Sequence, residues 1–348
     1  NELFLDTAIE NENVERLVRL NGIEIRGPSP ASVQLTIEMT VPAIISEGAA
    51  VPDSDNLPII NSRSIFTSNS GIEFELLEDV DFAKKDKDGN LLARIEDSII
   101  RSDGSIDSFI LSRKGICSSA KTNSESFAIG NELIPFRTLT INNADVSEII
   151  SVIDSEGDQY YQVESLTQDT VYERFDNTRQ DSELVPQRIK LIPAPRRFVT
   201  SRSTNTGLTT LRFGSGNNQV FDEDVIPDPS LNAIQFYGDR KTFGTISIDP
   251  NNFLKTGTLG ISPRNTTLTI TYRYGGGLAD NVSAGEIENV KILRTFFNSS
   301  VPFNIAANIR DSVTVTNFLP AAGGEDEPTL QELKLAAVLG ANSQGRIV

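Results

Sequence analysis

The segment Asp86-Lys87-Asp88-Gly89-Asn90 comes nearest, by residue type and spacing, to a metal site. Its oxygen-bearing side chains stand at alternate positions, as do the first three ligands of a calcium-binding EF-hand loop. The twelfth position of such a loop holds Asp97 instead of a bidentate glutamate, and no helix-loop-helix pattern surrounds it. A tight turn between two strands explains the same residues. We therefore predict a hairpin turn here and no bound metal.

The glycines of Gly214-Ser215-Gly216 raise the question of a phosphate-binding loop. Neither the G-x-G-x-x-G pattern nor the G-x-x-x-x-G-K-S/T pattern is completed there, so the backbone amides that cradle a phosphate are not specified. Glycine also serves where the backbone needs positive torsions. We expect no nucleotide and no other cofactor.

The chain contains no histidine and a single cysteine, Cys117. It therefore lacks the usual general base near neutral pH and the commonest metal ligand, which excludes Ser-His-Asp, Cys-His and histidine-zinc sites. The 48 acidic residues leave one enzymatic alternative, a glycan hydrolase with paired carboxylates. No local signature selects a pair, and no tryptophan is present to stack on a sugar ring. We predict that the protein is not an enzyme.

A small basic cluster lies in a proline-broken segment and consists of Arg188, Lys190, Arg196 and Arg197. One interpretation is a solvated edge or an extended connection. The other is a docking site for an acidic neighbour, such as a second copy of this chain. The sequence leaves both open.

Acidic residues outnumber Lys and Arg by 48 to 31, which gives a formal net charge of -17. Such a chain repels phosphate backbones and anionic headgroups, so neither nucleic acid nor a membrane is an expected partner. No apolar run reaches the roughly 20 residues that span a bilayer. A lone cysteine favours assembly in a reducing cytoplasm. Because the chain starts at Asn1 and stops at Val348 without a helix cap, we expect both ends to continue in the natural gene product.

Helices are expected near both ends of the chain, with strands between them. Apolar residues recur at helical spacing from Leu3 to Leu20, and Gly22 supplies a stop. A second helix is predicted over 328–339, where Pro328 suits the first turn. Strict alternation from Val33 to Val41 predicts a strand. Shorter strands are predicted over 73–77, 91–95, 106–111 and 138–141, and a hairpin over 149–163.

These elements predict an α+β, mainly β fold with several small β-sheet or sandwich domains and helices near the N- and C-termini. We divide the chain into an N-terminal helix with the first strand (1–45), a β-rich domain (46–135), an inserted β-rich domain (136–250), and returning strands with a C-terminal helix (251–348).

Three stretches of the chain carry a resemblance to a known family, in the family's order. The first runs from Glu2-Leu3-Phe4-Leu5-Asp6-Thr7-Ala8 through Asn21-Gly22 to Pro28. The second begins at Leu211-Arg212-Phe213-Gly214-Ser215-Gly216 and resumes at Leu268-Thr269-Ile270-Thr271-Tyr272-Arg273-Tyr274-Gly275-Gly276-Gly277 and Asp280-Asn281-Val282-Ser283-Ala284-Gly285-Glu286-Ile287. The third is Ala321-Ala322-Gly323-Gly324-Glu325-Asp326-Glu327-Pro328-Thr329-Leu330, then Leu333-Lys334 and Gln344-Gly345-Arg346-Ile347-Val348. Together they resemble the baseplate J-like family of contractile-tailed bacteriophages. The chain departs from the usual pattern at Ser215, where the family often has aspartate, and in the long interval within the second stretch, which suggests an insertion.

The resemblance implies a structural wedge component of the tail baseplate in the virion, assembled in the host cytoplasm. Such a protein links neighbouring wedges around the hub and takes part in the rearrangement that triggers sheath contraction. The implied partners are a second copy of the chain within the wedge and other wedge, hub and sheath-initiating proteins. A virion adhesin that binds a receptor is the alternative among structural proteins, although the sequence shows neither repeats nor a trimerisation pattern.

The two predicted helices supply the candidate interface residues. We expect Phe4, Leu17, Leu333 and Ala337 to contact helices of another wedge subunit, as the resemblance implies; the alternative is that the same apolar stripes close the protein's own core. The signature positions are interpreted as fold markers, and they are Phe213, Gly214, Gly216, Tyr272, Gly275, Gly276, Gly277, Asn281 and Gly285.

Overall fold

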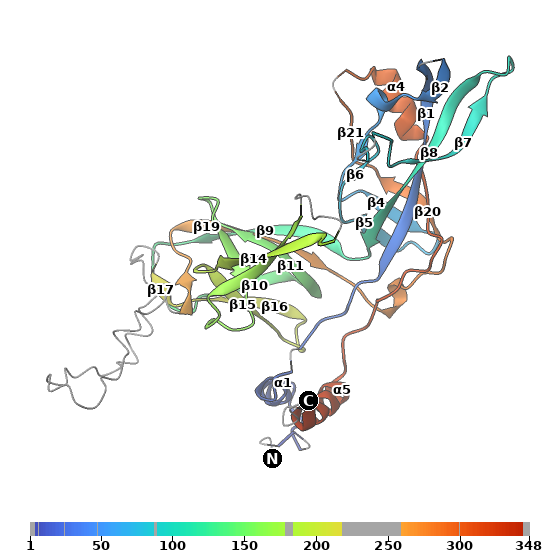
Figure 1. The fold of residues 1–348 in the computed structure, drawn as a ribbon. Helices are drawn as coiled ribbons and strands as arrows, with labels where there is room; N and C mark the ends of the chain where they lie inside the picture. The colour runs from blue at the N-terminus through green and yellow to red at the C-terminus, as the bar shows by residue number, and fades with distance from the viewer. Residues whose placement is uncertain are drawn as a thin grey trace. The chain divides into compact units, whose positions relative to one another are not determined.

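The computed structural model describes residues 4–5, 7–23, 25–46, 48–86, 89–177, 184–217, 259–298 and 300–343. The chain forms two compact units (Figure 1). The first unit comprises Asn1–Ile25, Asn123–Tyr272 and Leu330–Val348, and the second comprises Arg26–Thr122 and Arg273–Thr329. Strands dominate both units, so the predicted α+β, mainly β fold class is confirmed.

The four-part sequential division does not follow these units. Each unit is assembled from separated segments, because strands that pair come from distant parts of the chain. Of the expected insertion, residues 218–250 lie outside the described residues.

The second unit is built on a sheet of order β2-β1-β8-β5-β4-β20, with β22 added to β1 and β7 added to β8. The central strand β1 pairs antiparallel with β8 from Ser32↔Ser118 to Pro42↔Ser108. The predicted alternation holds along β1, where Val33, Leu35, Ile37, Met39 and Val41 are buried. The strands are β1 (Ser32–Ser46), β2 (Ala49–Pro52), β4 (Ile65–Ser68), β5 (Glu73–Leu76), β7 (Arg94–Ile100), β8 (Ile106–Ser118), β20 (Ile287–Ile292) and β22 (Thr314–Thr316).

One apolar core closes the second unit. The aromatic side chains of Phe66, Phe74 and Phe82 are fully buried in it together with the β1 face. Burying each such side chain stabilises the fold by about 1.5–3 kcal/mol. Helix α4 (Phe303–Asp311) contributes Ile309 to this core. A smaller sheet has the order β21-β3-β6, formed by β21 (Thr295–Phe296), β3 (Ile59–Ile60) and β6 (Val80–Asp81), and two short 3-10 turns are η1 (Ser54–Asn56) and η3 (Leu278–Asp280).

The first unit contains a sheet of order β10-β16-β15-β12-β11-β19-β9, in which β12 and β15 run parallel. Its core packs Tyr160 edge-on to Phe213, with ring centroids 5.5 Å apart, and Phe198 beside the same ring. Two further strand pairs stand apart from this sheet, β13 with β14 and β17 with β18. The strands are β9 (Lys121–Ile129), β10 (Thr138–Ala144), β11 (Val146–Ile153), β12 (Gln159–Gln162), β13 (Thr170–Asp176), β14 (Gln187–Pro193), β15 (Arg197–Arg202), β16 (Leu208–Phe213), β17 (Gly216–Asn217), β18 (Ile261–Ser262) and β19 (Thr266–Tyr274).

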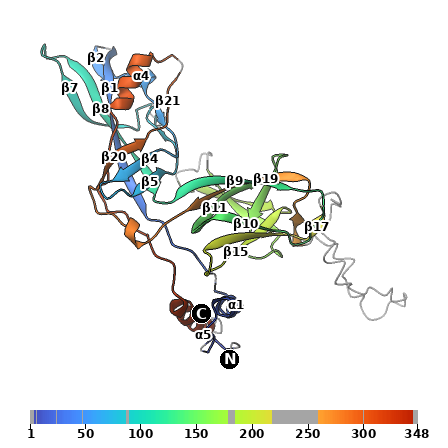
Figure 2. The ribbon, with the colours of Figure 1, turned by 180° about the vertical axis from the view of Figure 1, so that it is seen from behind.

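A pair of helices completes the first unit. Helix α1 (Asn11–Leu20) and helix α5 (Leu330–Ser343) lie side by side in both ribbon views (Figures 1 and 2). They share a small core in which Val14 and Val18 face Leu333 and Ala337. The opposite ends of the sequence thus meet in one two-helix module.

Several predicted boundaries are corrected by the structure. The first helix begins at Asn11, not Leu3, and the amides of Thr7 and Ala8 before it donate to the Phe4 carbonyl in a turn. Gly22 lies just past the helix end with φ 76°, which agrees with the prediction that this glycine ends the helix. The strand predicted over 91–95 is displaced to 94–100, and α4 was not predicted. The predicted hairpin over 149–163 is confirmed by the pairing of β11 with β12.

Candidate functional site

Parts of the second and third stretches that carry the resemblance meet Ser29, the residue directly after the first stretch, at one backbone junction of the second unit. Ser29 and Glu325 form an antiparallel bridge, with N to O distances of 2.8 and 3.1 Å. The amide of Gly277 donates to the Ser29 carbonyl at 3.1 Å. Residues from the beginning, the late middle and the end of the sequence are therefore hydrogen-bonded to one another here.

Glycine is required at this junction by close backbone approach. Gly276 has φ 131°, and a Cβ atom there would lie 2.7 Å from the Ser29 carbonyl carbon. A Cβ atom on Gly324 would lie 2.4 Å from the Gly277 oxygen. Both distances are shorter than non-bonded atoms tolerate, so these glycines allow the segments to touch. Gly275, with φ 95°, has open space around it.

Two asparagine side chains fasten the same region. Asn281 donates to the Gly324 carbonyl at 2.8 Å and accepts from the Gly324 amide at 2.9 Å. Asn317, only 1% exposed, donates to the carbonyls of Ser283 and Leu319 and accepts from the Ile287 amide. Its own carbonyl accepts from the amide of Gly285, where φ is 77°. Asn317 was not among the candidate residues predicted from the sequence, and no local motif marks it.

The other signature positions lie in the first unit and serve its packing. Phe213 and Tyr272 are fully buried. The Tyr272 hydroxyl donates to Glu125 and accepts from the Asn123 amide group at 3.1 Å. A Cβ atom on Gly214 would lie 2.1 Å from the Gly260 carbonyl carbon, so the two backbone segments at these glycines also approach closely.

The candidate interface residues divide into two groups. Leu333 and Ala337, 4% and 1% exposed, are buried against α1 within this chain, and Leu17 is partly buried beside them. Phe4 is 63% exposed. The alternative that the stripes close the protein's own core therefore holds for Leu333 and Ala337, whereas contact with another subunit stays a prediction.

The two-helix module keeps a second apolar surface, which we call the outer helix face. It consists of the exposed residues Leu335, Val338 and Leu339, whose spacing places them on one side of α5. Apolar side chains gathered in this way on a small module are typical of a protein-protein contact.

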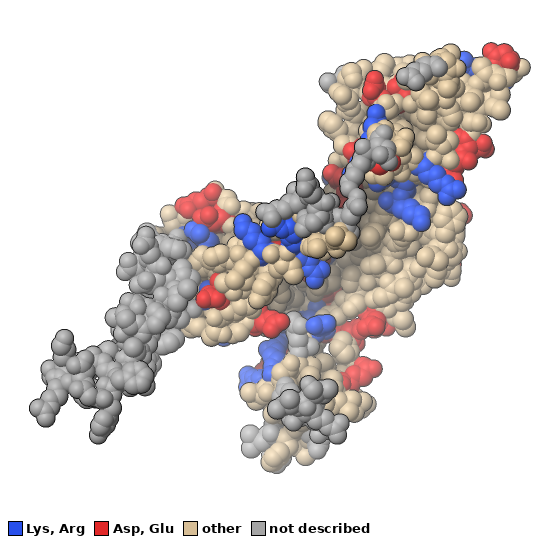
Figure 3. Space-filling model, viewed as in Figure 1, with Lys and Arg blue, Asp and Glu red and all other residues tan. Residues whose placement is uncertain are grey.

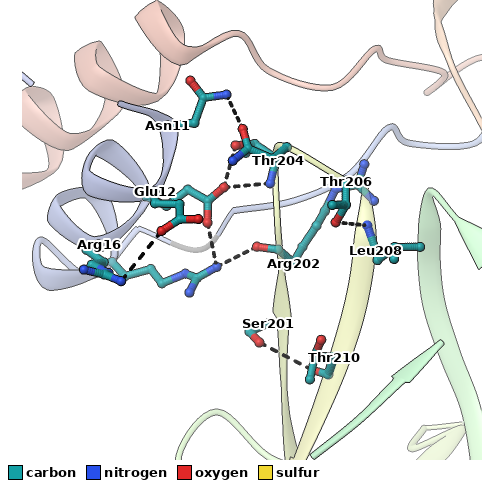
Figure 4. Close-up of polar contacts among 12 residues, drawn as sticks. Asn11, Glu12, Arg16, Ser201, Arg202, Thr204, Thr206, Leu208 and Thr210 are labelled. Carbon is teal, nitrogen blue, oxygen red and sulfur yellow. Dashed lines mark hydrogen bonds and ion pairs between the residues drawn. The ribbon is translucent and has the colours of Figure 1, made fainter. Parts of the chain in front are cut away.

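A polar latch holds α1 against the turn between β15 and β16 (Figure 4). The Glu15 carboxylate, in a residue only 6% exposed, accepts from the Thr204 amide at 2.7 Å and from its hydroxyl at 2.5 Å. Arg19 donates to the Arg202 carbonyl at 2.6 Å and lies 3.5 Å from Glu15. Among the described residues, only those of the N- and C-terminal segments contribute to the apolar core between the two helices. The module is thus attached to the sheet by polar groups and not by shared apolar packing.

The basic cluster is divided by the structure. Arg188 and Lys190 are exposed on β14, as a solvated edge requires. Arg196 pairs with Asp158 at 2.6 Å. Arg197 is fully buried, and its guanidinium donates to the carbonyls of Leu166 and Ala194 at 2.8 Å each. Burial lowers the pKa of Arg197, opposed by the nearby Asp169. Arg197 is therefore available neither as part of a solvated edge nor as part of a docking site.

The predicted turn at 86–90 is formed. An antiparallel bridge joins Lys85 to Leu91, and the amide of Asn90 donates to the Asp86 carboxylate at 2.8 Å. Residues 87 and 88 of this turn lie outside the described residues. Among the residues that are described, no group of three or more His, Cys, Asp or Glu side chains is placed to hold a metal ion.

The described carboxylates with shifted pKa values favour the ionised form. Hydrogen bonding from Lys291, with a further contribution from Lys121, holds the pKa of the Glu73 carboxyl below its usual value. Hydrogen bonds from Ser105 lower the pKa of Asp103. A glycan hydrolase needs a carboxylic acid whose pKa is raised, and neither residue has this property.

One pocket of 560 Å³ lies in the second unit. Its lining mixes the cations Lys84, Arg113 and Lys114 with Glu78, Asp79 and Asp81. Arg113 donates to the Asp81 carbonyl and is therefore engaged within the fold. Because the lining contains both cations and acids, it does not favour a ligand of either charge.

No helix among the described residues is long and apolar enough to cross a membrane. On the face drawn in Figure 3, acidic and basic side chains are both spread over the surface, and one group of basic ones lies at the place of β14. No protein-family model matches the chain, and no curated protein matches it either.

Proposed function

We propose that the protein is a structural, non-enzymatic wedge component of a contractile-tail baseplate. In this role it links neighbouring wedges around the hub and moves with them when the sheath contracts. Its partners are a second copy of itself and other wedge, hub and sheath-initiating proteins. Its place is the tail baseplate of the virion.

The observation that carries the proposal is the junction at Ser29, Gly277 and Glu325. Gly276, Gly277 and Asn281 of the second stretch and Gly324 of the third have mutually dependent packing roles at that junction. Their partner Ser29 directly follows the first stretch. A resemblance that arose by chance would not be expected to fall on residues that need one another.

The outer helix face supports the same proposal. A wedge protein acts through surfaces that bind other subunits, and this chain presents an apolar surface on a module attached by polar contacts. Such an attachment can be exchanged for another at little cost, because hydrogen bonds to a released Glu15 are replaced by water.

Electron cryomicroscopy of particles that contain the chain tests the proposal. We expect the chain in a ring around the tube at the tail end. Isolated trimers at fibre tips would instead support the adhesin, and absence from the particles would refute both.

A matched pair of variants tests the outer helix face. Leu335→Ser combined with Leu339→Ser should abolish incorporation into tails, measured by immunoblot of purified particles. Ile45→Ser, which changes an 83% exposed residue of the second unit, should not. Equal incorporation of both variants would refute this role of the face.

A further inference from the structure

The two-helix module has an apolar core of its own. The buried residues of this core all come from the terminal segments, and among those described they are Ala8, Val14, Val18, Ile25, Leu333 and Ala337. The Lys334 ammonium donates to the Ala8 carbonyl at 2.6 Å and adds a polar bond between the same segments. The pairing of α1 with α5 is therefore stabilised within the module itself.

The covalent connections of this module lead to the second unit. The chain enters the second unit after Ile25 and returns from it to α5 at Leu330. The large sheet of the first unit is joined to the second unit at two other places, after Thr122 and after Tyr272. The module and this sheet thus belong to one compact unit without a direct covalent link between them.

The polar latch is the attachment of α1 to this sheet. Asn11, Glu15 and Arg19 follow one another at four-residue spacing, so they lie along one line on the helix. Each of them makes a hydrogen bond to the turn between β15 and β16 (Figure 4). The bond that completes this set runs from the Asn11 amide group to the Asn205 side chain, at 2.6 Å. Helix α1 therefore uses its apolar stripe to bind α5 and a separate polar line to bind the turn.

The turn that receives α1 is closed by bonds of its own. The Arg202 guanidinium donates to the Gly207 carbonyl and to the Asp145 carboxylate, at 2.8 Å each, and the residue is buried. The Gly207 amide donates to the Ser203 carbonyl at 2.8 Å. Opening the latch therefore leaves both the turn and the helix pair with their internal bonds intact.

We propose that the polar latch opens reversibly and releases α1 and α5 together, as one paired body, from the sheet of the first unit. The released module stays covalently joined to the second unit. Opening at the latch costs less free energy than parting the helices, because water replaces the hydrogen bonds of the latch, whereas parting the helices exposes their apolar core. The inference concerns a motion within one chain and does not depend on the baseplate proposal.

Amide hydrogen exchange of the full chain tests the release. The Thr204 amide donates to Glu15 and reports the latch, and the amides of Val18 and Ala337 report the two helices. In the wild-type chain, exchange at Thr204 should be at least about tenfold faster than at either helix, because the helices stay paired in the released state. Glu15→Gln should speed exchange of α1 and α5 by the same factor, about tenfold, because the latch loses its charged acceptor and both helices exchange from the released state.

Thr204→Val makes the same test from the side of the sheet. The change removes the hydroxyl that donates to Glu15 at 2.5 Å and leaves the sequences of both helices as they are. It should speed exchange at Val18 and Ala337 alike, by about fivefold. The matched control is Thr206→Val in the same turn, where the hydroxyl accepts from the Leu208 amide instead. The control should leave exchange in both helices unchanged.

Three results would overturn the proposal. Faster exchange in α1 without the same change in α5 would show that the helices separate when the latch opens. Equally faster exchange in β15 and β16 would show that the whole unit opens. Protection of the wild-type Thr204 amide equal to that of the helices would show that the latch does not open by itself. None of these results bears on whether the chain occurs in tails.

Discussion

Replacing Gly276 by alanine should destabilise the second unit far more than the same change at its neighbour Gly275. Both glycines have positive φ, 131° and 95°, so each alanine bears a backbone penalty of about 1–2 kcal/mol. At Gly275 nothing lies within 4 Å of the new Cβ atom. At Gly276 the Cβ atom would lie 2.7 Å from the Ser29 carbonyl carbon and 2.8 Å from the Pro30 nitrogen.

The obstructing atoms are backbone, so no side-chain rotation relieves the overlap. Overpacking of this kind costs about 1–3 kcal/mol more. We therefore expect Gly276→Ala to lower the stability of the junction by about 2–5 kcal/mol in total. Gly275→Ala should lower it only by the backbone penalty of about 1–2 kcal/mol. The difference corresponds to about a 5- to 150-fold change in the opening equilibrium of the junction.

Hydrogen exchange of the full chain measures this difference locally, which avoids assuming that the two units unfold together. The informative amides are those of Ser29, Ser32, Gly277 and Ala322, whose bonds cross the junction. Equal protection of these amides in the two variants would refute the close approach of Gly276 to Ser29.

Three further predictions concern single side chains. Glu15→Gln should speed amide exchange in α1 by about tenfold, because the bonds from Thr204 lose a charged acceptor; Glu12→Gln, at an exposed pair, should have no effect. Burial raises the pKa of Tyr160 from 10.0 to about 12, so its stabilising contribution is complete below pH 10.0 and is lost as the pH rises through about 12. Tyr160→Phe should therefore flatten the alkaline part of a plot of unfolding free energy against pH, and an unchanged slope would contradict the assignment. Burial, with a smaller contribution from Glu75, raises the pKa of the Cys117 thiol, so a thiol reagent should react only as fast as the chain unfolds; rapid labelling of the native chain would disprove this.

Much of the β structure could be predicted where one strand face is buried. The alternation from Val33 to Val41 was predictable because the inner side chains enter the core, whereas among the outer ones only Thr36 is buried. Helix α4 gave no comparable signal, since Ile309 is its only buried residue and Phe303 is 88% exposed. The first helix was predicted too long because Ala8 is buried by the helix pair without being helical.

Site residues were harder to predict because their partners are distant in sequence. Asn317 binds backbone groups across a junction that no local pattern reveals. Arg196 lies in the bend before β15 and Arg197 begins that strand, so strand alternation could not separate the two cations in the sequence. The carbonyls that bind Arg197 come from Leu166 and Ala194, and no local pattern marks them.

The chain passes between its two units four times, because three segments of one alternate with two of the other. Two of these crossings fall within β9 and β19, which are neighbours in one sheet. A tensile load on either unit is therefore shared among four covalent tethers. A protease that severs one tether leaves three intact, so a single nick does not release either unit from the other.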